Sequence, residues 1–269
     1  MNKKILKNII FLLFLSSRFT MIFCSENDFK SEANIKVLVL IIASDNLPIY
    51  IQLQNIWKSY MHYNPKKINA YFIRGNPSIA ENFQITSDTL WLKTEESLKT
   101  GVTTKTILAF ETALSQLPHF DYILRTNLSS FYIFDRVLSF LEKAPKNDFY
   151  CGFQNYFSGV HYASGSGFFL SRDLVELIVK NKNYFLDQPN EWDDLIIGKF
   201  LHSQGKKVVD QRMLRLANIK EWDNNKKKIP KDIFQIRVRS CPLIYDCPER
   251  LTQEIPIHKE LLKMFYGIR

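Results

Sequence analysis

The sequence lacks the features that mark several classes of protein. No two cysteines are separated by only two residues and no HExxH motif occurs, so neither a structural zinc site nor a zinc protease is indicated. Glycine and proline are scarce, at 9 and 10 of 269 residues, and no internal repeat appears. With 46% hydrophobic and 23% charged residues, the composition excludes a fibrous or disordered protein and is typical of a globular domain.

Acidic residues are outnumbered by basic ones, which gives a formal net charge of +9. Part of this excess lies in the first 25 residues, which contain no acid and carry Lys3, Lys4, Lys7 and Arg18. The mild excess over the rest of the chain suits anionic ligands such as nucleotides. It is too diffuse to indicate a nucleic-acid-binding protein, so nucleic acid is not an expected partner.

Residues 1–25 have the pattern of a targeting segment, with a basic start and an apolar run from Ile9 to Leu15. This run is much shorter than the roughly 20 residues that span a bilayer comfortably. A cleaved signal peptide and an uncleaved signal anchor both remain open. The first predicts a secreted or cell-envelope protein. The second predicts a type II membrane protein with its domain on the lumenal side of an endomembrane.

Cysteine spacing allows one local disulfide. Cys241 and Cys247 lie six residues apart and flank a proline-containing turn. In an oxidising compartment a small-loop disulfide is expected there, and two unlinked thiols are the alternative.

Strand and helix patterns alternate over residues 33–269, which we interpret as a single domain. The run 35–44 is apolar and rich in β-branched residues, which predicts a strand buried on both faces, as in a parallel sheet. Pro48 opens an amphipathic helix. Further strands are predicted at 68–74, 121–125, 149–157, 161–170, 208–209 and 234–240, and further helices at 103–117, at 135–143, after a capping Ser171 and at 193–201. This alternation predicts the α/β class.

Three other segments complete this interpretation. The polar stretch 125–130 follows a predicted strand, and ligands of open α/β sheets bind beyond such carboxyl ends. The segment 161–170 is predicted to begin as a loop of small residues before its strand. The stretch 224–228 is predicted to be a solvated loop, and the alternation in 234–240 places Arg237 and Arg239 on one face.

Four segments, in order, resemble the galactosyltransferase and fringe-like β-1,3-glycosyltransferases, which have a GT-A fold. They are the opening strand with a helix containing Trp57, TTKT at 103–106 (similar to LTLKT), GSGFFLS at 165–171 (similar to GGGYVLS) and DDLIIG at 193–198 (similar to EDVYVG and DDMTLG). Each motif is weak by itself, but their order and spacing over residues 36–201 support one another. The resemblance implies a GT-A-like, mostly parallel nucleotide-sugar-binding sheet flanked by helices.

The same resemblance implies a function. A hexose or N-acetylhexosamine would move with inversion from a nucleotide sugar, expected to be a UDP-sugar, to a hydroxyl of a glycan or glycoprotein. Asp194 holds the position of the catalytic base, which takes the proton from the acceptor hydroxyl, and Asp193 is the second candidate. The alternative is that both carboxylates only stabilise the N-terminus of a helix.

The resemblance also implies acceptor-binding residues. Gly165, Ser166 and Gly167 would let a sugar approach the backbone closely, or would simply form a tight turn. Trp192 would stack on a sugar face, or would pack against the start of its helix.

One family motif is altered. The DxD motif, which holds a divalent ion on the donor diphosphate, corresponds here to Asn127, Leu128 and Ser129, and Asn127 offers only an amide oxygen. Mn²⁺ therefore remains a possible cofactor without an assigned ligand set. Without a metal, basic side chains must neutralise the diphosphate. The candidate donor-binding residues are Lys105, Arg125, Asn127, Ser129, Arg237 and Arg239.

The altered motif supports a second hypothesis, in which a catalytically silent GT-A-like domain binds a glycan or a nucleotide. A third is an unrelated α/β nucleotide-binding domain, which would lack a cleft joining Asn127 to Asp194.

Overall fold

The computed structural model of the protein describes residues 35–97, 100–188, 191–241 and 247–269. The chain from Asn34 to Arg269 forms one compact unit. The predicted targeting segment, residues 1–25, lies outside the described residues and stays a prediction. Across the described ranges, no helix is both long enough and apolar enough to cross a membrane.

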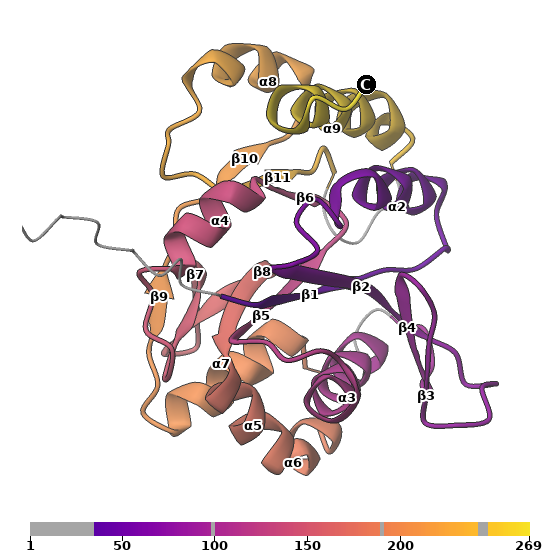
Figure 1. Ribbon diagram of the computed structural model, residues 1–269, viewed down its shortest axis with the longest axis vertical. Coiled ribbons are helices and arrows are strands. Elements are labelled where there is room, and N and C mark those ends of the chain that lie inside the picture. Colours follow the sequence, from indigo (N-terminus) through magenta and orange to yellow (C-terminus); the bar gives the residue numbers. More distant parts are fainter. Residues whose placement is uncertain (1–34, 98–99, 189–190, 242–246) are drawn as a thin grey trace, which may run out of the picture. The chain divides into compact units, whose positions relative to one another are not determined.

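A sheet of eight strands forms the centre of this unit, in the order β3-β4-β2-β1-β5-β8-β7-β9 (Figure 1). The strands are β1 (Val37–Ile42), β2 (Ile68–Gly75), β3 (Phe83–Ile85), β4 (Thr89–Leu92), β5 (Tyr122–Asn127), β7 (Tyr150–Phe157), β8 (Val160–Ser171) and β9 (Val208–Asp210). Strands β4, β2, β1 and β5 run parallel to one another, whereas β3 runs antiparallel to β4, and β8 runs antiparallel to both β5 and β7. The predicted α/β class with a mostly parallel sheet is confirmed.

Four helices cover one face of this sheet (Figure 1). They are α3 (Thr100–Gln116), α5 (Arg172–Lys180), α6 (Lys182–Leu186) and α7 (Asp193–Ser203). Leu38 and Leu40 of β1 belong to the same buried cluster as Ile107 and Phe110 of α3. The intervening residue Val39 is also fully buried. Both faces of β1 are therefore covered, as its unbroken apolar run predicted.

The opposite face carries a second, three-stranded sheet and the remaining helices (Figure 1). Its strands, in the order β10-β11-β6, are β10 (Leu214–Leu216), β11 (Gln235–Val238) and β6 (Ser130–Tyr132). The helices are α2 (Pro48–Tyr60), α4 (Phe134–Leu141), α8 (Ile219–Asn225) and α9 (Glu249–Tyr266). Stacked aromatic rings of Trp57, Tyr60 and Phe131 join α2 to β6. The chain passes from the large sheet to the small one directly after β5.

Three local predictions are wrong. The segment 161–170 contains no loop, because β8 is continuous there, although its residues 164–167 bulge out opposite the single residue Phe153 of β7. Ser171 does not cap α5 with its side chain, since its hydroxyl accepts the Phe149 N–H at 2.9 Å instead. The stretch 224–228 is the end of α8 followed by a 3₁₀ turn at Lys226–Lys228.

The cysteines take the first of the two expected arrangements. Cys241 and Cys247 form a disulfide, with their Cα atoms 6.2 Å apart, and it connects the chain after β11 to the start of α9. Cys151 is a free, buried thiol in β7.

Candidate active site

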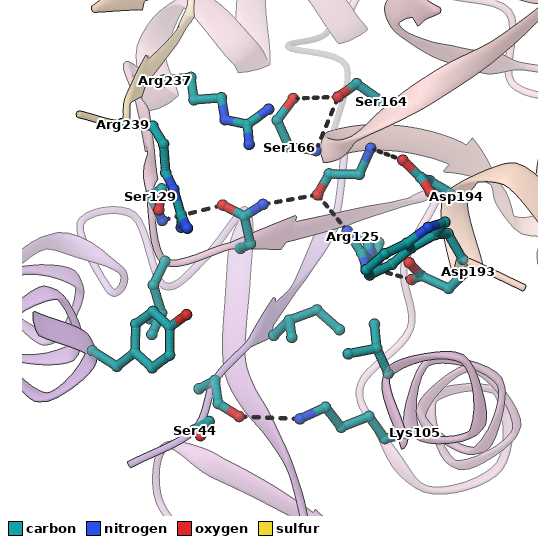
Figure 2. Close-up of a pocket in the computed structure, with 18 of the residues that line it drawn as sticks. Ser44, Lys105, Arg125, Ser129, Ser164, Ser166, Asp193, Asp194, Arg237 and Arg239 are labelled. Carbon is teal, nitrogen blue, oxygen red and sulfur yellow. Dashed lines mark hydrogen bonds and ion pairs between the residues drawn. The ribbon is translucent and has the colours of Figure 1, made fainter. Parts of the chain in front are cut away.

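A cleft of about 790 Å³ lies at the carboxyl ends of β1 and β5. Its walls come from the large sheet, from the N-terminal end of α7 and from β10 and β11 of the small sheet. The polar stretch after β5 therefore borders a cleft, as the rule for open α/β sheets predicted. Figure 2 shows Asp193 and Asp194 on one side of this cleft and Arg237 and Arg239 on the other.

Asp193 is held in a buried ion pair. Its side chain is 3% exposed and pairs with the guanidinium of Arg125, which is also 3% exposed. The hydroxyl of Thr106 donates a second hydrogen bond to Asp193, at 3.0 Å. With its charge matched and its Oδ2 bonded to both Arg125 and Thr106, Asp193 fixes the start of α7 against β5 and α3. This geometry is that of a positioning residue, and the role of alternative base that the sequence allowed stays a prediction.

Asp194 is the carboxylate of this pair that is available to a ligand. Its Oδ2 accepts the Gly165 N–H at 2.6 Å and its Oδ1 accepts the Leu195 N–H at 2.9 Å, which leaves further lone pairs on both oxygens. Burial, reinforced by the neighbouring charge of Asp193, raises the pKa of Asp194 above its ordinary value. A carboxylate with a raised pKa is a stronger base once it is ionised.

Two glycines of the GSGFFLS motif have different surroundings. A Cβ on Gly165 would lie 2.9 Å from Asp194 Oδ2, so the bare backbone allows the carboxylate to approach. A Cβ on Gly167 would lie 1.8 Å from the hydroxyl oxygen of Tyr132. Gly165 and Ser166 line the cleft, whereas Gly167 packs against β6 and is not among the lining residues. The predicted acceptor-binding role of Gly167 therefore finds no support in the lining of the cleft and stays a prediction.

The TTKT motif holds the acidic segment in place. Thr103 donates to the Glu191 carbonyl at 3.1 Å and Thr106 donates to Asp193, from the same face of α3. Lys105 lines the cleft but is only 1% exposed, and its ammonium donates to both carboxylate oxygens of Glu96 at 2.8 Å. Lys105 and Arg125 were predicted to contact donor phosphate, but each already has a carboxylate partner.

The altered DxD segment forms a fixed turn between the two sheets. The Asn127 amide donates to the Gly165 carbonyl at 2.9 Å, and its oxygen accepts the Ser129 N–H at 3.1 Å. Trp57, from the first motif, donates its indole N–H to the Leu128 carbonyl at 3.2 Å. Asn127 and Ser129 both line the cleft, as the sequence predicted for the donor side.

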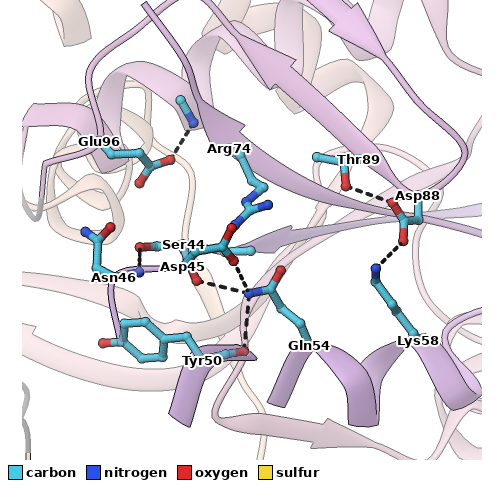
Figure 3. Close-up of polar contacts among 12 residues, drawn as sticks. Ser44, Asp45, Asn46, Tyr50, Gln54, Lys58, Arg74, Asp88, Thr89 and Glu96 are labelled. Carbon is cyan, nitrogen blue, oxygen red and sulfur yellow. Dashed lines mark hydrogen bonds and ion pairs between the residues drawn. The ribbon is translucent and has the colours of Figure 1, made fainter. Parts of the chain in front are cut away.

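The loop after β1 completes this wall of the cleft. Ser44 and Asn46 line it, and Asp45 between them is anchored away from it by Arg74 and Gln54 (Figure 3). The hydrogen bond from Arg74 is the main reason that the pKa of Asp45 lies below its ordinary value, although partial burial opposes it. The loop therefore has a defined conformation without a ligand.

Three arginines line the far side of the cleft. Arg237 and Arg239 project from β11 and the residues after it, as the strand alternation predicted. Arg215, on β10, lies directly beside Arg237 in the strand register and was not identified from the sequence. The alternation of Leu214, Arg215 and Leu216 is too short to identify a strand, although it resembles the pattern that revealed β11. Burial and the mutual repulsion of these arginines lower the pKa of Arg237.

Aromatic residues surround Asp194. Trp192, at the start of α7, and Tyr162, on β8, both line the cleft. Gly198, one turn into α7, faces Tyr162 so closely that a Cβ there would lie 2.2 Å from the Tyr162 Cβ. Trp192 therefore lines the same cleft as Asp194, its predicted stacking on a sugar stays a prediction, and Tyr162 is a second aromatic ring there that the sequence did not suggest.

The residues present do not fit a divalent ion at the altered DxD segment. Over the described ranges, no group of three His, Cys, Asp or Glu side chains is arranged to hold a metal ion. The carboxylates that line the cleft are those of Glu96, Asp193 and Asp194, and the first two are engaged by Lys105 and Arg125. Mn²⁺ prefers several oxygen ligands that include carboxylate, which Asn127 and Ser129 do not supply.

Comparisons with known proteins show no family for this chain. No family model matches the sequence, and no curated protein matches it. One similar solved structure is a glycosyltransferase involved in the glycosylation of the major capsid of PBCV-1, at 9% identity and a TM-score of 0.48, covering 86% of this chain and 99% of that one. Another is the catalytic domain of Drosophila beta1,4galactosyltransferase 7 in complex with xylobiose, at 12% identity and a TM-score of 0.39, covering 65% and 64%. The resemblance to fringe-like β-1,3-glycosyltransferases stays a prediction.

Proposed function

We propose that the protein is a glycosyltransferase that moves a hexose or N-acetylhexosamine from a nucleotide sugar to a hydroxyl of a glycan or glycoprotein. The observation that carries this proposal is the polarity of the cleft, which has an available carboxylate, Asp194, on one side and the guanidiniums of Arg237 and Arg239 on the other. A nucleotide sugar needs cationic partners for its diphosphate, and its acceptor needs a base. The four GT-A-like motifs of the sequence agree with this assignment.

The proposed reaction is a single displacement with inversion. The acceptor hydroxyl oxygen attacks the anomeric carbon and forms the new glycosidic bond while Asp194 takes the hydroxyl proton. The bond between the anomeric carbon and the phosphate oxygen breaks on the opposite face, and the nucleoside diphosphate leaves with that electron pair. The proton stays on Asp194 until it passes to solvent, so charge and atoms balance.

The surroundings of Asp194 support its assignment as the base. The backbone donors of Gly165 and Leu195 fix both of its oxygens, and the Asp193–Arg125 pair fixes the helix that carries it. A base held in this way loses little orientational freedom on reaching the transition state. Trp192 and Tyr162 flank it at the position that an acceptor sugar would occupy.

A catalytically silent domain that binds nucleotide or glycan is the second candidate, and the altered segment Asn127–Ser129 favours it. The targeting segment is consistent with either function in an export compartment, in a secreted or a type II membrane protein. We propose a UDP-sugar as the donor of the transferase.

The test compares Asp194→Asn with the unmodified chain. Nucleotide release from a panel of UDP- and GDP-sugars, with simple glycosides as acceptors, should fall by roughly 10²-fold or more, since a general base contributes about 10²–10⁴-fold. Asp135→Asn, at the exposed first turn of α4, is the matched control for a helix-terminal carboxylate and should keep full activity. Nucleotide binding without any release in the unmodified chain would establish the silent domain instead.

A further inference from the structure

Arg215 and Arg237 form a paired cationic surface on the small sheet. They are direct register partners on the parallel strands β10 and β11, so their side chains leave the same face of that sheet. Arg239 follows two residues after Arg237, and all three line the cleft. The sheet therefore brings guanidiniums from two separate parts of the chain to one wall.

This positive charge is not matched by the protein around Arg215 and Arg237. Among the residues that the structure describes, no carboxylate lies within ion-pair distance of either guanidinium, and Arg215 instead packs over the ring of Phe153, with 4.1 Å from its guanidinium carbon to the ring centroid. The Nε of Arg237 is buried without a hydrogen-bond partner. Arg239 is oriented by its Nε, which donates to the Cys241 carbonyl at 2.9 Å.

Such an arrangement is unfavourable without an anion. A buried donor without a partner costs free energy, and adjacent like charges add to this cost. An anion with several acceptor oxygens accepts the unpaired hydrogen-bond donor and offsets the repulsion between the like charges. The planar N–H donors of a guanidinium can bind two phosphate oxygens at once. The carboxylates Glu96 and Asp193, which line the other parts of the cleft, are already bonded to Lys105 and Arg125. Arg215 and Arg237 are therefore the cleft cations without a carboxylate partner among the described residues.

We propose that Arg215, Arg237 and Arg239 bind a diphosphate group directly and perform the charge neutralisation that a divalent ion would otherwise supply. The identification of this diphosphate as part of a nucleotide sugar rests on the proposed function, but the anion site does not. During transfer, the same guanidiniums stabilise the negative charge that develops on the departing diphosphate. A phosphate on the acceptor presents the same chemistry and is distinguished by the probes below.

The experiment is calorimetric titration of the full chain with UDP, UMP, inorganic pyrophosphate and glucose 6-phosphate, each in EDTA and in Mn²⁺. UDP and pyrophosphate should bind equally well in both conditions. Arg215→Gln and Arg237→Gln should each weaken UDP binding by roughly ten- to a hundredfold, as expected for the loss of a charge-assisted hydrogen bond. Arg212→Gln is the matched control, because Arg212 is exposed, lies outside the cleft and pairs with Asp232 at 2.8 Å.

Folding is checked by thermal unfolding without ligand. Since Arg237 has no ion-pair partner to lose, Arg237→Gln should leave the midpoint unchanged or raise it. UDP binding only with Mn²⁺, equal binding by Arg237→Gln and the unmodified chain, or no binding of any probe would overturn the proposal. Tighter binding of glucose 6-phosphate than of UDP would assign the arginines to the acceptor and also overturn it.

The two proposals fail separately. Metal-independent UDP binding that depends on Arg215 and Arg237, without any sugar transfer, would remove the proposed function and keep the diphosphate site. Sugar transfer that needs Mn²⁺ and is unchanged by both substitutions would keep the proposed function and remove the diphosphate site.

Discussion

Adjacent residues in the DDLIIG motif have opposite electrostatic environments. Asp193 is neutralised by Arg125, whereas Asp194 accepts only backbone N–H groups and has a raised pKa. The sequence predicts the two carboxylates, but the difference between their environments depends on Arg125. This residue lies on β5, 68 positions before Asp193. A residue pattern confined to one helix cannot contain that information.

Under the proposed function, the pKa of Asp194 should set the pH dependence of transfer. Because burial raises this pKa above the ordinary value of 3.8, kcat/KM should rise with pH along an acidic limb whose midpoint lies above 3.8. UDP binding, which depends on arginines that stay protonated, should not follow this limb. A pH profile of nucleotide release beside a calorimetric profile of UDP binding checks the assignment, and an acidic limb at or below 3.8 would contradict it.

The same shift predicts a stability effect. A raised native pKa means that the folded state holds the Asp194 proton more tightly than the unfolded state does. The contribution of Asp194 is therefore most favourable below pH 3.8 and becomes unfavourable as pH rises through the native pKa.

Breaking the buried ion pair should destabilise the protein. Asp193→Asn leaves the Arg125 guanidinium buried without its carboxylate, which should lower the free energy of unfolding by about 3–5 kcal/mol. Urea unfolding measures this loss. The double variant Arg125→Met/Asp193→Asn should recover about 2 kcal/mol relative to the sum of the single variants. Strict additivity would show that the two side chains do not interact.

Among the strands and helices, β8 positions residues at the cleft because of its bulge. The pairing moves from Ala163 opposite Gln154 to Phe168 opposite Gly152, so the residues between them do not alternate regularly. Gly165 can thus face Asp194 while Gly167 faces Tyr132. The small residues at 164–167 predicted a loop because glycine is rare inside strands. Their presence in β8 is explained by the contacts that they make across the bulge.

This packing predicts a specific rescue. Gly167→Ala places a Cβ against the Tyr132 hydroxyl and should cost about 1–3 kcal/mol, as overpacking does. Tyr132→Phe removes that oxygen, after which the nearest atoms are Gln235 Nε2 at 3.0 Å and Tyr132 Cζ at 3.1 Å. The double variant should regain most of the loss in denaturant unfolding. A double variant as unstable as Gly167→Ala would show that the Tyr132 hydroxyl is not the obstacle.

For the whole molecule, the disulfide connects the small sheet to the C-terminal helix. The loop closed by Cys241 and Cys247 is short, so the Cys241→Ser/Cys247→Ser double variant should lose about 2 kcal/mol of unfolding free energy. Burial raises the pKa of Cys151 to about 12, so this thiol should not react with an alkylating reagent in the native protein. Denaturant unfolding measures the loss in the double variant. Mass spectrometry after alkylation, with and without reductant, reports the state of each thiol, and alkylation of Cys151, Cys241 and Cys247 in the unreduced native chain would contradict both predictions.

The sequence predicted the large sheet well and the small sheet poorly. Long apolar runs such as 35–44 identify strands by themselves. Strands β6 and β10 have three residues each, and α9 contains Pro256, which argues against a helix when the sequence is considered alone. Arg215 lies on the three-residue strand β10 and was therefore missed, whereas the longer alternation of 234–240 identified Arg237 and Arg239.

The cleft lies between two sheets, and the chain enters each of them more than once. Ligand binding in this cleft should therefore affect the stability of the folded protein. A ligand bound there contacts both sheets, so it stabilises only the state in which they are docked. Free ligand at a hundred times its Kd would add about 2.7 kcal/mol to the folded state. The abundance of the protein would then follow the supply of the ligand that this cleft binds, because proteolysis acts on the unfolded chain that ligand binding depletes.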